Sequence, residues 1–287
     1  MAKQRKSNWS QLLDSVQEDD GLPVREAGPW TFNKLWWWNR YIEIATVAMA
    51  DKPHWSGLVY VDLFAGPGIC VSRRDGSRIP GSPLIAAQAP KQFEKLLLCE
   101  EDPELAAACE KRLSLIGAAN RSTVFRGDCN EQISSIANQI PDRSLTLAFV
   151  DPTGLHADFE SIRKLTENRR VDLVILFADN MDIVRNVVVY AKQNQSNLDR
   201  TLGPDSGWRN EWTSLTNQTP ANIARLFVKI YKQQLARHLG YLHTDDEVLK
   251  NSLGTPIYRL VYASKNKLGL KFWQETASKE RLGDRLF

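Results

Sequence analysis

Between residues 57 and 177, short apolar runs alternate with amphipathic stretches of helical length. The apolar runs contain few polar positions, which is typical of strands that are buried on both faces. They are GLVYVDLF, EKLLLCEE, STVFRGD, SLTLAFVDP and VDLVILFA, and the helical stretches between them are GSPLIAAQAP, DPELAAACEKRLSLIG, NEQISSIANQI and DFESIRKLTE. This alternation predicts an α/β fold with a parallel sheet that helices cover on both faces.

The pattern changes near the C-terminus, where GYLHTDDEVL and PIYRLVYAS are joined by the turn-prone KNSLGT. These two β-like runs predict an antiparallel hairpin that ends the sheet. Five parallel β/α units followed by such a hairpin is the order of the Rossmann-like class I methyltransferase fold. A dehydrogenase-type Rossmann domain would continue with a sixth parallel strand instead.

The remaining segments define the domain organisation. We expect a single methyltransferase-like domain over residues 29–280, beginning with a long helix at 30–50. Residues 1–28 are polar and are expected to be loosely ordered. The stretch at about 178–218 becomes rich in Asn, Gln and Gly, so we interpret it as an inserted helical or loop segment, or lid. Residues 281–287 form a basic C-terminal tail.

Charge and composition argue against a membrane protein and a metal site, but they do not decide whether the protein binds nucleic acid. The chain has a net charge of +3, with +3 on the first ten residues, +5 on residues 250–287 and −5 between them. Basic ends of this kind suit either contact with phosphates or a merely solvated surface. No apolar run approaches the ~18 residues that span a bilayer, and no signal peptide is recognisable, so we expect a cytoplasmic protein without a membrane. The four cysteines form no CxxC pair, and no metal-ligand spacing appears.

Chemistry-bearing residues follow the first three strand-like runs. In a doubly wound sheet these positions lie at the carboxyl edge, where ligands bind. The candidates are Asp62 late in the first run with Ala65, Gly66 and Gly68 after it, Glu100 at the end of the second run and Asp128 at the end of the third.

These residue types suit S-adenosylmethionine. The glycines let the backbone approach a ligand without a Cβ atom, Glu100 can accept from both ribose hydroxyls, and Asp128 can accept from the adenine amine or simply cap the next helix. Asp62 can hold the turn or meet a cationic amine. Because ICVSRRDGSRIP separates the glycines from the next helix, a ligand without phosphates fits better than a dinucleotide.

The motif DPTG follows the fourth run and bears on the acceptor. Base amino-methyltransferases commonly place D/N/S-P-P-aromatic here: the acid and a backbone carbonyl accept from the exocyclic amine, and the ring stacks on the base. Asp151 and Pro152 retain the first half, and we predict that they are catalytic. Without the ring, three explanations stay open: a tryptophan at 36–38, 208 or 212 stacks instead, the base is already unpaired, or the motif is of the DPxG kind, similar to that of tRNA guanine N2-dimethyltransferases. A mere capping role for Asp151 is the alternative.

Several stretches together resemble one family, the three-Cys-motif partner proteins. They are YVDLFAGPGIC, IPGSPLIAA, LLLCEEDPE, FVDPTGL, LDRTLGPDSGWR and PIYRLVYASKNKLGLKFW, and the resemblance covers about residues 30–278. It implies a class I methyltransferase-like fold and a co-encoded partner that carries the three cysteines, which are not the four of this chain. By position, it also assigns cofactor binding to Asp62, Gly66, Gly68, Glu100 and Asp128.

The leading hypothesis is therefore an S-adenosylmethionine-dependent N-methyltransferase that acts on an exocyclic amine of a nucleobase, in DNA or RNA. The alternative is a non-catalytic or degenerate methyltransferase-like partner of the co-encoded cysteine protein. A third hypothesis, a small-molecule methyltransferase, predicts that polyanions would not compete for binding. The target base, the polymer and the oligomeric state are left open by the sequence.

Overall fold

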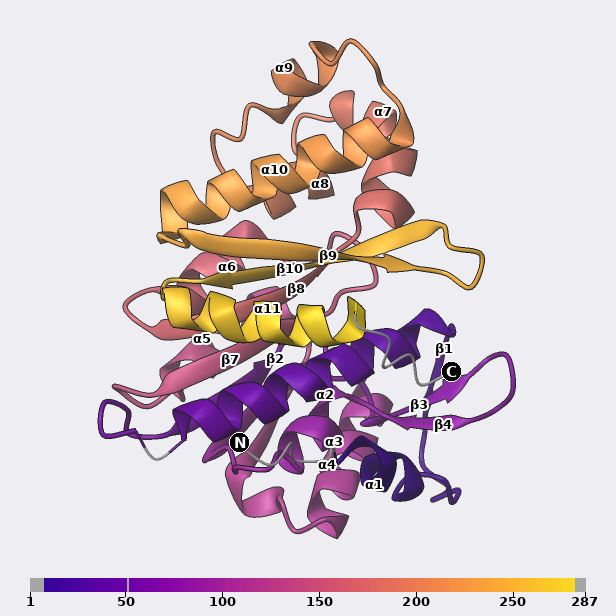
Figure 1. The fold of residues 1–287 in the computed structure, drawn as a ribbon, viewed down its shortest axis with the longest axis vertical. Coiled ribbons are helices and arrows are strands. Elements are labelled where there is room, and N and C mark those ends of the chain that lie inside the picture. The colour runs from indigo at the N-terminus through magenta and orange to yellow at the C-terminus, as the bar shows by residue number, and fades with distance from the viewer. Residues whose placement is uncertain (1–7, 51, 282–287) are drawn as a thin grey trace.

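The structure, a computed structural model, describes residues 8–50 and 52–281, with side chains described up to residue 276. Its centre is a seven-stranded sheet in which five strands are parallel and the last two form an antiparallel hairpin (Figure 1). In spatial order the strands are β6 (Ser122–Arg126), β5 (Lys95–Glu100), β2 (Leu58–Asp62), β7 (Leu145–Val150), β8 (Arg170–Phe177), β10 (Pro256–Ser264) and β9 (His243–Lys250). The predicted hairpin and the class I methyltransferase fold are thus confirmed.

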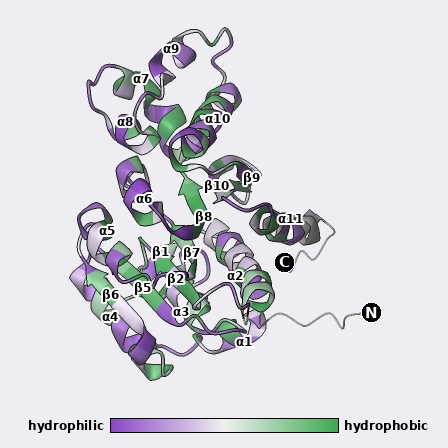
Figure 2. Cartoon of the chain, turned by 90° about the vertical axis from the view of Figure 1, so that its left-hand side faces the viewer, coloured by the Kyte–Doolittle hydropathy of each residue, from purple (hydrophilic) through white to green (hydrophobic). Residues whose placement is uncertain are grey.

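Helices cover both faces of this sheet, as the alternating pattern predicts (Figure 2). On one side α2 (Trp30–Met49) packs between α3 (Ser82–Ala87) and α11 (Lys267–Arg281), and α3 packs on α4 (Pro103–Leu115). On the other side the contacts run from α5 (Cys129–Asn138) to α6 (Phe159–Thr166), α8 (Asn197–Leu202) and α10 (Pro220–Leu239). Every residue of β2 and β7 is buried, which explains why their sequences are unbroken apolar runs.

The segment at 8–28 differs from its expected loose order. It contains α1 (Trp9–Asp14) and β1 (Arg25–Ala27), and β1 pairs in parallel with β3 (Ile69–Ser72), which in turn pairs with β4 (Arg78–Pro80). The physical reason is Arg112 on α4, whose side chain is only 3% exposed and needs acceptors. It donates to the Asp20 carboxylate at 2.7 Å and to the Pro23 carbonyl at 2.7 Å. These bonds anchor the segment across the carboxyl edge of the sheet, while residues 1–7 lie outside the described residues.

The stretch at 178–218 forms a helical layer rather than an open loop. It contains the π-helix η2 (Asp179–Ile183), α7 (Val184–Ala191), α8 and α9 (Trp208–Thr213). Outside this stretch, a 3-10 helix, η1 (Ala119–Arg121), precedes β6. Trp208 is buried against Phe227 of α10, and its indole N–H donates to Asp199 at 2.7 Å. The layer is therefore fixed to α10, and its action as a lid stays a prediction. Residues 282–287 of the predicted basic tail lie outside the described residues.

Among the helices of residues 8–50 and 52–281, none is long and apolar enough to cross a membrane.

Candidate functional site

A cavity of about 560 Å³ opens at the carboxyl ends of β2, β7 and β8. Its walls come from the turn after β2, the segment after β7, the first turns of α2, strand β1 and the start of β10. Its size lies within the range of small-molecule sites, about 300–1,000 Å³. Of the residues predicted from the sequence, Ala65, Gly66, Gly68, Asp151 and Pro152 line it.

The glycine turn presents its backbone to this cavity. Gly66 and Gly68 have φ values of 65° and 89°, a region that favours glycine. The Gly66 N–H donates to the Glu100 carboxylate at 2.7 Å, and the Ala65 N–H donates to the Cys99 carbonyl at 2.8 Å. The turn is therefore held by β5 and leaves room for a ligand beside it.

Asp62 lies beneath the turn, and it does not line the cavity. Its carboxylate accepts from the Phe64 N–H at 3.2 Å and from the Tyr60 hydroxyl at 2.9 Å. Burial raises its pKa to about 6, although hydrogen bonds from Ser82 and Tyr60 favour the charged form. Of its two predicted roles, these contacts are those of a residue that holds the turn.

Ionisation of Asp62 is expected to lower the free energy of unfolding of the wild type as pH rises, and Asp62→Asn is expected to remove this pH dependence. Because the folded pKa of about 6 lies above the usual 3.8, the folded state binds more protons than the unfolded state between these values, so wild-type stability falls as pH rises. The stability of the wild type minus that of Asp62→Asn is expected to fall by up to about 3 kcal/mol between pH 4 and 7. Urea unfolding at several pH values measures this difference. A difference that does not vary with pH would contradict the prediction, and Asp14→Asn, at an exposed position, is the control.

Glu100 is positioned near the turn, but an arginine covers it. The carboxylate is only 5% exposed and accepts from the Gly66 N–H and, at 3.1 Å, from the Asp102 N–H. Arg25 of β1 donates to the same carboxylate at 3.2 Å, and Arg25 itself lines the cavity. Glu100, the predicted ribose-binding group, is thus paired with Arg25. This arginine belongs to the N-terminal segment, which the sequence pattern did not connect to the site.

Asp128 lies apart from the cavity. It is exposed and is the N-cap of α5, where its carboxylate accepts from the Asn130 N–H at 2.7 Å. Capping was the alternative predicted for it, and this contact is present. Contact with an adenine amine stays a prediction.

Asp151 forms a buried ion pair with Lys34 of α2. The side chains are 14% and 7% exposed, and one carboxylate oxygen, Oδ2, accepts from the Lys34 ammonium group. The other oxygen, Oδ1, is buried and has no hydrogen-bond partner in the described part of the chain. Burial raises the pKa of Asp151, although the charge of Lys34 favours the ionised form. Asp151, which lines the cavity, therefore has one acceptor that no group in the described part of the chain satisfies.

Sequence reasoning did not select Lys34, although a signal for it exists. The predicted helix is apolar at Leu35 and Trp38, and the lysine lies on this buried side, where a charge needs a partner. Its ammonium group also lies 5.1 Å from the centroid of the Trp30 ring and 5.9 Å from that of Phe149. These ring faces stabilise the cation in the cavity wall.

Aromatic rings border Asp151, but not those proposed from the sequence. Trp37 and Trp38 are buried in the core, and Trp208 packs on α10. Instead, Trp30 and Tyr258 line the cavity with ring centroids 4.7 Å apart. The Tyr258 hydroxyl donates to the carbonyl of Thr153 at 3.4 Å, which links the pair to the DPTG segment.

Among solved structures, the chain is similar to several methyltransferases. The chain is similar to an O-methyltransferase from Bacillus cereus in complex with SAH, with 13% identity, a TM-score of 0.45 and coverage of 92% of this chain and 93% of that one. It is similar to the O-methyltransferase TomG from Streptomyces achromogenes in complex with SAM, with 12% identity, a TM-score of 0.42 and coverage of 80% of both chains. The METTL16 MTase domain has 12% identity, a TM-score of 0.46 and coverage of 90% and 79%. The fold class of this chain rests on its own strand order, since these scores are low.

Sequence comparisons add no family. No protein-family model matches the chain, and no curated protein matches it. The class that the structure defines is therefore a protein with the class I methyltransferase fold and a cavity at the carboxyl edge of its sheet.

Proposed function

We propose that this protein is an S-adenosylmethionine-dependent methyltransferase that modifies an exocyclic amine of a nucleobase. The observation that carries the proposal is the Asp151 Oδ1 atom, which is buried and has no partner among the described residues, in a cavity that the Trp30 and Tyr258 rings also line. A buried acceptor without a donor is costly unless a ligand satisfies it. An amine on a flat aromatic base provides both the donor and the stacking surface.

The turn after β2 and the carboxylate of Glu100 are the groups that would hold the cofactor. The backbone at Gly66 and Gly68 is open to the cavity, and an added Cβ at Gly66 would approach no atom closer than 3.8 Å, in the Arg25 side chain. The residues present fit an adenosine ligand provided that Arg25 releases Glu100 or shares it with the ribose. When bound, S-adenosylmethionine supplies an electrophilic methyl group.

The residues of the acceptor half would position the base. Asp151 Oδ1 accepts a hydrogen bond from the amine, and this bond directs the nitrogen lone pair toward the methyl donor. Trp30 and Tyr258 supply a stacking surface worth about 1–3 kcal/mol per base. Alignment of this kind accounts for a large part of the rate enhancement in reactions between two bound groups.

A base within a nucleic acid is favoured over a free nucleoside by the arginines around the cavity. Arg25, Arg73 and Arg185 line it, and Arg73 and Arg185 are exposed. Guanidinium groups at a cavity rim are suited to phosphate contacts. If they contact a polymer, binding weakens steeply as salt increases.

A second candidate, a non-catalytic partner of a co-encoded protein, is favoured by a different observation. Both carboxylates that the reaction would use are already paired: Glu100 with Arg25, and Asp151 with Lys34. The resemblance to the three-Cys-motif partner proteins gives this candidate its partner. It predicts a stable complex with the cysteine protein and no methyl transfer.

Calorimetric titration with S-adenosylmethionine, followed by transfer assays with labelled cofactor on DNA, RNA and nucleosides, tests the proposal. Saturable cofactor binding with label in a nucleobase supports the methyltransferase. Absence of binding at millimolar cofactor would overturn it. Binding without transfer, together with co-purification of the cysteine protein, would select the second candidate.

Two variants of the ribose-binding group are expected to change cofactor affinity in opposite directions. Glu100→Gln is expected to weaken binding about 10-fold or more, since it removes a charged acceptor. Arg25→Ala is expected to tighten binding by up to about fivefold, because it frees Glu100 from a partly exposed ion pair. Calorimetry measures both changes. Arg73→Ala is the matched control, because Arg73 lines the cavity but pairs with Glu26 instead, and weaker binding by Arg25→Ala would contradict the covering role.

A further inference from the structure

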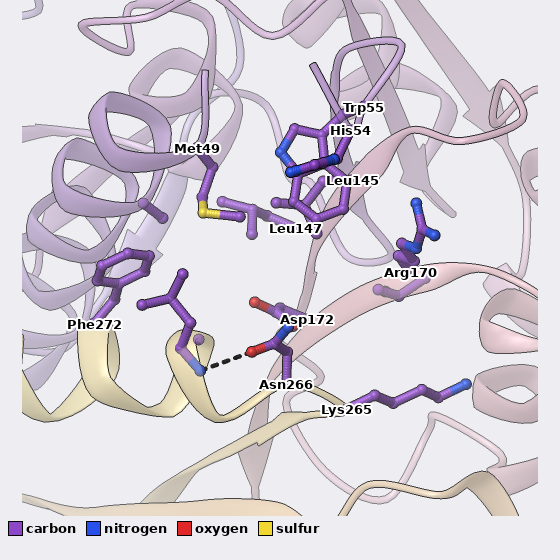
Figure 3. Close-up of a pocket in the computed structure, with 14 residues that line it drawn as sticks. Met49, His54, Trp55, Leu145, Leu147, Arg170, Asp172, Lys265, Asn266 and Phe272 are labelled. Carbon is purple, nitrogen blue, oxygen red and sulfur yellow. Dashed lines mark hydrogen bonds between the residues drawn. The ribbon is translucent and has the colours of Figure 1, made fainter. Parts of the chain in front are cut away.

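A second cavity, of about 420 Å³, opens at the opposite edge of the sheet, at the amino ends of β7 and β8 (Figure 3). It shares no lining residue with the candidate methyltransferase site. The last turn of α2, the loop at His54 and Trp55, and the first turns of α11 enclose it. Its volume also lies in the range of small-molecule sites, so the protein has a separate place for a ligand.

The walls of this cavity are largely apolar. Met49 comes from α2, Leu145 and Leu147 from β7, and Phe272 from α11. The Trp55 indole also lies in the wall, and its buried N–H has no acceptor in the described part of the chain. Such a wall suits a hydrocarbon body.

One ionisable carboxylate, that of Asp172 on β8, faces this apolar space (Figure 3). It accepts from the Tyr262 hydroxyl at 3.2 Å, from the Tyr41 hydroxyl at a longer 3.5 Å, and from Ser264. Burial raises its pKa to about 6, a value at which the group is still ionised at neutral pH. Hydroxyl donors therefore hold a negative charge at the base of the cavity.

Among the side chains that the structure describes, those of residues 8–50 and 52–276, no lysine or arginine forms an ion pair with this carboxylate. Two cations lie nearby, but each has another contact. The Lys265 ammonium donates to the Thr166 carbonyl at 3.2 Å and points away from the cavity (Figure 3). The exposed Arg170 guanidinium lies 5.4 Å from the centroid of the Trp55 ring. Asp172 is partly buried, a carboxylate in such surroundings without a cation is costly, and a cationic ligand would remove that cost.

We propose that this cavity binds a small organic ammonium ion, whose charged nitrogen donates to Asp172 and whose hydrocarbon body contacts Met49, Leu147 and Phe272. The Trp55 and Phe272 rings in the wall add attraction for a cation. The first turn of α11 closes over the carboxylate at Gly269, where an added Cβ would lie 2.7 Å from the Asp172 carboxylate oxygen. This close approach shields the charge from water and strengthens its attraction for the ammonium ion.

Titration of the intact protein with three probes of similar shape tests the proposal: benzylammonium, benzyl alcohol and benzoate. Binding is followed by amide chemical shifts, which also report where each probe binds. We expect benzylammonium to bind at the cavity at least about tenfold more tightly than benzyl alcohol, as a charge-assisted hydrogen bond provides, and benzoate to bind more weakly than either. Asp172→Asn is expected to abolish the preference. Asp142→Asn, an exposed carboxylate near the same edge, is the matched control and is expected to retain it.

The comparison among probes on the wild-type protein needs no variant, so the test stands even if Asp172→Asn fails to fold. As a second variant, Ala45→Phe fills the cavity from α2 and is expected to reduce binding of benzylammonium without removing Asp172. Equal binding of the three probes, tighter binding of benzoate, shifts confined to other surfaces, or no saturable binding at millimolar probe would each overturn the proposal. None of these readouts depends on methyl transfer.

Discussion

Replacing Asp151 with alanine is expected to reduce methyl transfer at least about 100-fold, while the dissociation constant of S-adenosylmethionine changes less than about threefold. The variant loses the oxygen that would accept from the substrate amine, and groups that orient or take part in proton transfer contribute about 10²–10⁴-fold. The proposed cofactor contacts lie on the turn after β2 and are left intact. Initial rates with labelled cofactor and calorimetry measure the two effects separately.

The matched control for this variant is Glu26→Ala. Glu26 also lines the cavity, but its carboxylate is exposed and pairs with Arg73, so its loss is expected to change the rate little. Because Asp151→Ala leaves Lys34 without its partner, the folded fraction of the variant has to be confirmed by thermal unfolding before rates are compared. Transfer at the wild-type rate by a folded Asp151→Ala variant would show that this carboxylate does not position the acceptor.

Replacing Lys34 with methionine is expected to lower the free energy of unfolding by about 3 kcal/mol at neutral pH. Removing one member of a buried ion pair leaves the other charge uncompensated, and both side chains here are largely buried. Methionine has a similar length, so the loss of packing is small. Urea unfolding measures the change. The double variant Lys34→Met/Asp151→Leu is expected to recover most of it, because no buried charge remains.

The effect of Lys34→Met is also expected to diminish as pH falls. Burial already raises the pKa of Asp151, and Lys34 opposes that increase, so removing the lysine raises the pKa further. In the folded variant Asp151 then takes up a proton at a higher pH than in the unfolded chain, and the deficit is present above its folded pKa and is lost as pH falls through it. A deficit that is the same at pH 5 and pH 8 would contradict this account of the pair.

The strands of the sheet could be predicted from the sequence because the hydrophobic pattern that marks each strand lies within a few consecutive residues. The apolar runs at β2, β5, β7 and β8 are strands buried on both faces, and such strands need no knowledge of their neighbours to be recognised. The turn with Gly66 and Gly68 was accessible for the same reason, since a positive φ favours glycine whatever lies around it. Asp151 was found because it directly follows an apolar run at the edge where parallel strands place their ligands.

The partners of the site residues could not be found in this way. The contact between Arg25 and Glu100 joins residues 75 positions apart, and that between Lys34 and Asp151 joins residues 117 apart. Trp30 and Tyr258 come from opposite ends of the domain and meet only because α2 and β10 both reach the same edge. The sequence around Asp172 carries no signal of a site. The absence of an ion pair at its carboxylate among the described side chains depends on where Lys265 and Arg170 point.

The sequence by itself therefore determined the order along the chain of the main-sheet strands and the helices between them, the glycine turn and the positions of the acidic residues at the carboxyl edge. Only the tertiary structure decided which of those acids face a cavity, which are paired with a cation and which aromatic rings lie beside them. The physical reason is that hydrophobic periodicity and backbone preference act over a few residues. Burial and ion pairing depend instead on segments that chain folding brings together from distant positions.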